Sequence, residues 1–239
     1  VARALVWLCV SNVSVFGGRL DEALPASSCS QASAKAAGVL WFQRIAEGIE
    51  MMTYGAMGDR DGVLARASHA IHAGGGSPLG EGRALMTTSL ALRDVAVHEL
   101  ALEYAEKASV LLQNDSDRGF LFGSLALSAV LRWRLQRPGA FAGLREALEE
   151  FLAHHIAAQW IGPAIGDVLT MVHECHPTNE TVRTSCARGV VWMERSGTRP
   201  QELAGIIDIL GEEVLTHERA ELALDAPLGE LVADWLEVV

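Results

Sequence analysis

Four residues of this chain are the best suited to hold a metal ion. They are His173, Cys175 and His176, in the stretch HECH, and Cys186. Zinc takes four His or Cys ligands in a tetrahedral arrangement. His173 and His176 share a helix face at a spacing of three residues, and Pro177 is expected to end that helix. The second close Cys pair that is usual in structural zinc sites is missing. The alternative interpretation is a helix C-terminus, where histidine interacts favourably with the helix dipole. We expect no metal and no cofactor.

Other chemistry-bearing patterns are weaker. Trp133 lies among Arg132, Arg134 and Arg137, residues that could stack on bases, although a solvated turn with the indole packed inward is the simpler interpretation. The glycine-rich stretch AGGGSPLGEGR follows a helical pattern and lacks the Lys-Ser/Thr ending of a phosphate loop. The chain has no Gly-x-Ser-x-Gly, His-Glu-x-x-His or paired-carboxylate motif. We therefore expect a protein that is not an enzyme.

Charge and composition narrow the classes of partner. The net charge is −11, and residues 199–239 carry ten acidic side chains against two arginines. A field of this sign disfavours direct nucleic-acid binding and permits a basic partner. Lys35 and Lys107 are the only lysines, and this bias towards arginine, with abundant Ala and Gly, indicates a GC-rich bacterial genome. No apolar run reaches the roughly 18 to 20 residues that span a bilayer. We expect a soluble, cytoplasmic fragment of a longer protein that does not bind membranes.

The elements that must position these residues are helices. Apolar residues recur at intervals of three and four, Gly, Pro and Asn separate the segments, and no strand–helix alternation appears. The fold class is therefore all-α. The segments with this periodicity are 41–57, 84–92, 100–112, 121–135, 141–153, 156–172, 182–193, 203–215 and 228–238.

A repeat organises the first two thirds of the chain. The stretch GRLDEAL at Gly18 aligns with GDRDGVL at Gly58, and related units begin at Ala96 and Gly139. The intervals are 40, 38 and 43 residues, and self-similarity near 40 indicates stacked antiparallel helical hairpins joined by tight turns. Asp21 and Glu22 are then acids in the first turn of a helix, where the helix dipole stabilises them, and not a catalytic pair. Pro25 lies where the second helix of the first hairpin should continue, which predicts a short or kinked helix there.

These repeats resemble the tetratricopeptide repeat (TPR). In ELALEYAEKASVLLQND, residues 99–115, Ala101 and Ala108 match the two small positions of the second helix. Tyr54, Gly58 and Ala70 match the tyrosine, turn glycine and final alanine of the second unit. The longer period resembles the helical-repeat regions of bacterial regulators such as the large ATP-dependent LuxR-type activators. This resemblance implies a right-handed solenoid over residues 1–155, with further helical hairpins over residues 156–239 that continue or cap it.

Stacked hairpins form a concave groove that binds a peptide, a protein or a small ligand. The repeat phase predicts that the groove is lined by Met52, Met86, Arg93, Trp133 and Gln136. We therefore expect a protein-binding or ligand-sensing module of a bacterial signalling or transcription regulator. A homodimerisation scaffold is the alternative, in which the C-terminal segment presents Ile206, Ile209, Leu231 and Trp235 to a second copy. A metal-dependent helical enzyme that uses the His/Cys cluster is a third.

Overall fold

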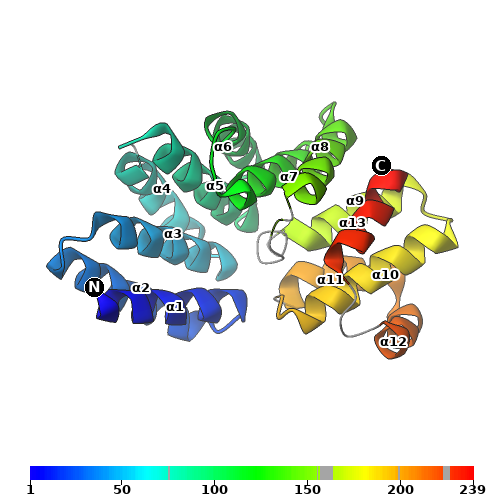
Figure 1. Cartoon of the computed structure of the whole chain (residues 1–239), viewed down its shortest axis with the longest axis horizontal. Coiled ribbons are helices and arrows are strands. Elements are labelled where there is room, and N and C mark those ends of the chain that lie inside the picture. Colours follow the sequence, from blue (N-terminus) through cyan, green and yellow to red (C-terminus); the bar gives the residue numbers. More distant parts are fainter. Residues whose placement is uncertain (75, 155, 157–163, 199, 223–226) are drawn as a thin grey trace. The chain divides into compact units, whose positions relative to one another are not determined.

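The predicted fold class is confirmed. The computed structural model describes residues 1–74, 76–154, 156, 164–198, 200–222 and 227–239, and it contains thirteen helices and no strand over these ranges (Figure 1). The chain divides into two compact units, Val1–Asp115 and Ser116–Val239. The extent of the repeats in the sequence predicted a domain boundary between residues 155 and 156 instead. Within the described ranges no helix has the length and apolar character that crossing a bilayer requires.

Unit 1 contains six helices, each of which contacts its neighbours in the chain. In addition, the first helices of successive pairs contact one another: α1 packs on α3 and α3 packs on α5. The bounds are α1 (Ala2–Phe16), α2 (Leu20–Ala36), α3 (Leu40–Ala56), α4 (Arg60–Gly74), α5 (Pro78–Asp94) and α6 (His98–Leu111).

The predicted turns share one backbone geometry. Gly18, Gly58 and Ala96 have φ of +74°, +72° and +58°. The N–H of each donates to the carbonyl three residues earlier, and the next N–H donates to the carbonyl five residues earlier, which is the Schellman ending of a helix. The fourth turn was predicted at Gly139, but this hydrogen-bond pattern occurs at Gln136, with φ +53°. The corrected intervals are 40, 38 and 40 residues, a more regular repeat than the one predicted.

α2 continues through Pro25. This proline is exposed and lies inside a helix of 17 residues, so the expectation of a short helix was wrong. Pro25 has no N–H to donate to the carbonyl of Asp21. The buried face of α2 carries small side chains: Ala23, Ala26, Ser27, Ser30 and Ala34. The Ser30 hydroxyl donates to the Ala4 carbonyl of α1 at 3.0 Å.

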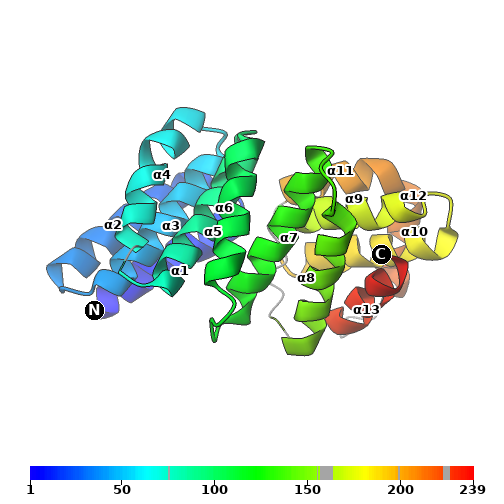
Figure 2. The same cartoon turned by 90° about the horizontal axis from the view of Figure 1, so that it is seen from above.

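Unit 2 contains seven helices, of which α7 and α8 lie side by side (Figure 2). Two predicted segments differ from the observed helices. The segment 203–215 is two helices, because Gly211 takes φ +81° between them. The segment 156–172 falls partly outside the described residues, and its helix begins at Ile165. The bounds are α7 (Arg118–Arg134), α8 (Ala140–His154), α9 (Ile165–Cys175), α10 (Glu180–Arg195), α11 (Pro200–Leu210), α12 (Glu212–Glu221) and α13 (Leu228–Val238).

The last helix, α13, completes the core of unit 2. It contacts α8, α9 and α10, and Trp235 is fully buried (0% exposed), with its indole N–H donating to the Ser185 carbonyl at 3.5 Å. Ile206 and Leu231 are also buried, so three of the four C-terminal side chains predicted to be exposed are core residues; Ile209 is the exception. The prediction of amphipathic helices was correct, but their apolar sides face this chain's own helices.

Candidate binding site

A candidate site in unit 2 lies at the turn between α7 and α8. The last turn of α7 presents Trp133 and Arg134, and the Schellman turn then directs Gln136 and Arg137 into the loop before α8. The Arg137 N–H donates to the Arg132 carbonyl at 2.8 Å, which fixes the loop backbone. Local hydrogen bonds therefore hold four polar or aromatic side chains at one helix end.

α9 anchors this turn from a distant part of the sequence. The Trp133 indole N–H donates to the Glu174 carboxylate at 2.7 Å, and the Arg134 guanidinium is paired with Asp167. Trp133 is half-buried against the hydrophobic core of unit 2, so its indole is held by packing as well as by the hydrogen bond. The packing and the hydrogen bond together restrict rotation of the indole.

An open pocket of about 820 Å³ lies at this turn. Its apolar surface comes from Trp133 and from Phe141, which is 39% exposed at the start of α8. Arg134, Gln136, Arg137 and Glu174 supply polar groups around it. Among the described residues that line the pocket there is no Cys, His, Ser or Thr that could act as a nucleophile. Aromatic faces bordered by guanidinium and amide groups suit an apolar or aromatic anchor side chain with hydrogen bonds at its edge.

The structure brings together two of the five predicted groove residues, Trp133 and Gln136, both of which line this pocket. The other three belong to unit 1. Met86 is 2% exposed, and Arg93 is 7% exposed with its guanidinium 2.6 Å from the Asp94 carboxylate. Burial on this scale leaves both with little surface for a partner. Met52 is half-buried against a small core cluster of α1, α2 and α3.

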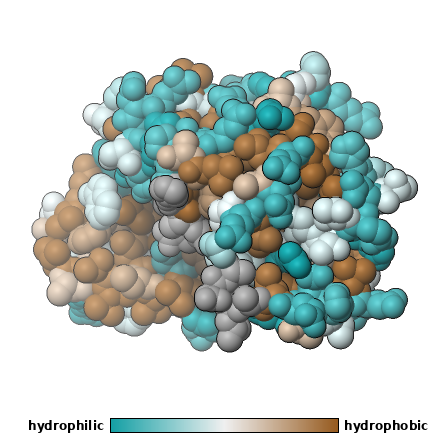
Figure 3. All heavy atoms as spheres, turned by 45° about the vertical axis from the view of Figure 1, so that its right-hand side comes forward, coloured by the Kyte–Doolittle hydropathy of each residue, from teal (hydrophilic) through white to brown (hydrophobic). Residues whose placement is uncertain are grey.

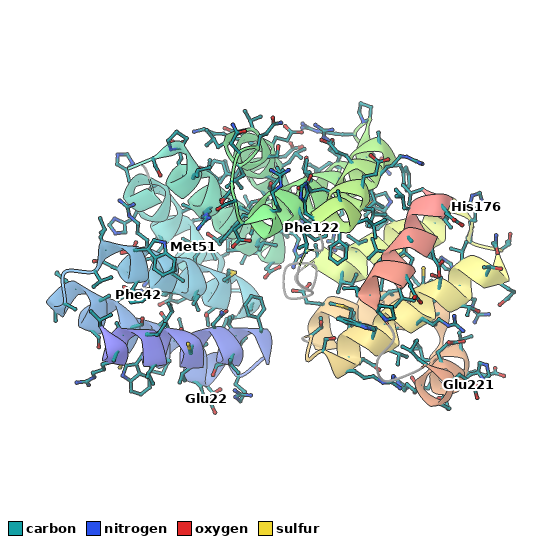
Figure 4. All side chains as sticks on the ribbon, in the orientation of Figure 1. Glu22, Phe42, Met51, Phe122, His176 and Glu221 are labelled. Atoms are coloured by element: carbon teal, nitrogen blue, oxygen red, sulfur yellow. The ribbon has the colours of Figure 1, made fainter. Side chains whose placement is uncertain are left out.

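The candidate metal ligands His173, Cys175, His176 and Cys186 do not form a ligand set among the described residues, where no three His, Cys, Asp or Glu side chains gather. Cys186 is fully buried, and desolvation, reinforced by the neighbouring Cys175, raises its pKa to about 12. Burial also raises the pKa of Cys175. Since a thiolate is the form that binds metals, both shifts work against coordination. His173 lies near the end of α9, and His176 lies in the turn that follows (Figure 4).

Two pocket residues, Phe141 and Glu174, were not among the candidates. Phe141 occupies an ordinary apolar position in a helical pattern, and nothing in the local sequence distinguishes it from a core residue. Glu174 lies 41 residues from Trp133, so no local pattern links the two side chains.

Comparison of this chain with protein-family models, with curated proteins and with solved structures finds no match.

Proposed function

We propose that this chain is a non-enzymatic, TPR-like helical-repeat module of a cytoplasmic bacterial signalling or transcription regulator. Its partner is a peptide segment whose apolar or aromatic side chain enters the pocket at the α7–α8 turn. The observation that carries the proposal is this pocket, which combines two predicted groove residues with the exposed face of Phe141 and has no Cys, His, Ser or Thr among its described lining residues.

The repeat geometry supports the first half of the proposal. Four of the Schellman turns among the described residues, at 18, 58, 96 and 136, recur at intervals of 38 to 40 residues, which supports stacked helical hairpins. The same hydrogen-bond pattern also ends helices at Gly38 and Gly197. The homodimer through the C-terminal helices is not retained, because most of its predicted contact residues are core residues of unit 2.

Selection from a displayed library of random peptides tests the binding function. We expect the selected peptides to share an aromatic or leucine anchor, and their affinity to fall about tenfold or more for Phe141→Ala, equivalent to about 1.4 kcal/mol. Val110→Ala is the matched control, since Val110 is an apolar residue of α6 that is 69% exposed and lies outside the pocket. Equal affinities of the two variants, or no selected peptide at all, would exclude this pocket as the site.

A further inference from the structure

Helix α1 has a second apolar face. Its inner face is buried in unit 1 and consists of Ala4, Leu8, Ser11, Ser14 and Val15. What we call the outer face of α1 consists of Leu5, Val6, Cys9, Val10 and Val13, which are all exposed. Figure 3 shows hydrophobic side chains gathered over the lower left of the molecule, where Figure 1 places α1. A contiguous exposed apolar face indicates a surface that contacts another element.

The repeat relates this face to one that is buried in α3. The turns at residues 18 and 58 are 40 residues apart, so each residue of α1 corresponds to the residue of α3 that lies 40 positions later. The counterparts of Val6, Cys9 and Val13 in α3 are Ala46, Ile49 and Thr53. None of these three is more than 2% exposed. The same positions of the repeat are therefore buried in α3 and exposed in α1.

Helices α1 and α2 cover this face of α3. Ala46 and Ile49 belong to a hydrophobic cluster that includes Leu8 of α1. The Gln31 amide of α2 donates to the Glu50 carboxylate of α3 at 2.5 Å. The hairpin α1–α2 therefore occupies on α3 the face that stays exposed on α1.

The next repeat has the same arrangement. The turns at residues 58 and 96 are 38 residues apart, so Ala91 of α5 corresponds to Thr53 of α3, and it is also fully buried. A Cβ placed on Gly55 of α3 would lie 2.7 Å from the Ala91 Cα atom, so α3 packs closely on α5 at this position. Helix α4 contacts α5 as well. In α3 and in α5, this face is thus covered by the helix pair that comes before it.

Composition and charge favour the same kind of partner for α1. Terminal repeats of a solenoid carry a polar outer face, whereas the outer face of α1 consists of three valines, a leucine and a cysteine. A second whole copy would bring a net charge of −11, which disfavours self-association. Residues 1–40 carry three basic side chains against two acidic ones, so a hairpin of this composition adds no such repulsion.

We propose that the outer face of α1 binds a further helical hairpin of the same repeat, which packs on α1 as the hairpin α1–α2 packs on α3. Its contact face carries small and apolar side chains, as Leu8, Val15 and Ala23 do in the cluster with α3. It buries Cys9, whose counterpart Ile49 is 2% exposed. The proposal rests on the helical repeat of the proposed function and does not depend on the pocket at the α7–α8 turn.

A chain extended by one repeat tests this proposal. A second copy of residues 1–40, in which Cys9→Ser and Cys29→Ser leave no thiol, is joined directly before Val1, so that the 40-residue interval between turns recurs. We expect alkylation of the original Cys9 by a maleimide to slow about tenfold or more, because the added hairpin covers this thiol. The original Cys29, on α2, should react at an unchanged rate. Mass spectrometry of the labelled peptides measures both rates, and circular dichroism measures the helix gained.

Val13→Glu in the original α1 places a charge on the outer face. In the extended chain it should return the alkylation of Cys9 to the rate of the same variant without the extension. Val110→Glu introduces the same charge at an exposed valine of α6 and should leave Cys9 shielded. A Cys9 that reacts equally fast in the extended and unextended chains would overturn the proposal, and so would shielding that survives Val13→Glu. Peptide selection at the pocket is a separate measurement, so the two proposals can fail independently.

Discussion

At the scale of single residues, one close contact in the core of unit 2 depends on a glycine. A Cβ on Gly189 of α10 would lie 2.6 Å from the Trp235 ring and 3.0 Å from Leu169. Both are buried core residues with no room to move aside. We expect Gly189→Ala to lower the free energy of unfolding by about 1 to 3 kcal/mol, measured by urea denaturation.

Gly205→Ala is the matched control for this prediction. Gly205 also lies inside a helix, α11, and a Cβ there meets nothing within 4 Å. The same substitution should therefore stabilise the protein by up to about 1 kcal/mol through helix propensity alone. If Gly189→Ala proved as stabilising as Gly205→Ala, the tight contact between α10 and Trp235 would be wrong.

Residue type and spacing together explain which turns could be predicted. Gly18 and Gly58 are visible in the sequence because glycine adopts positive φ without strain. Ala96 was found only through its spacing from them. The turn at Gln136 was missed because a glycine lies three residues later, at Gly139, and the alignment placed the turn there. A regular period close to 40 would have been the stronger guide.

At the scale of elements, α2 carries a built-in weakness. Pro25 is the sixth residue of this helix, where proline removes one backbone hydrogen bond and crowds the carbonyl of Asp21. Its side chain is exposed, so its replacement disturbs no core contact. We expect Pro25→Ala to raise the free energy of unfolding by about 1 to 3 kcal/mol, measured by chemical denaturation.

Pro78→Ala provides the comparison, because Pro78 is the first residue of α5, where the missing N–H has no partner to lose. That variant should gain nothing and should lose slightly through the unfolded state, which proline restricts. Equal gains from the two substitutions would mean that Pro25 does not strain α2.

Helical periodicity explains why most elements could be predicted and why their partners could not. The segment 228–238 was placed to the residue, since an amphipathic pattern identifies a helix and its apolar side. The same pattern does not identify what that side contacts. Trp235 was therefore expected at a dimer surface, although it packs on α10 of its own chain. Likewise, the repeat led to the prediction of Trp133 and Gln136 as groove residues, whereas Glu174 comes from a helix with no repeat relation to them.

At the scale of the whole molecule, the excess of acids makes copies of this chain repel one another. Part of the C-terminal acidity is neutralised within unit 2, where Arg188 lies 2.9 Å from the Glu218 carboxylate and Arg219 is paired with Glu212. The remaining charge still makes two copies repel.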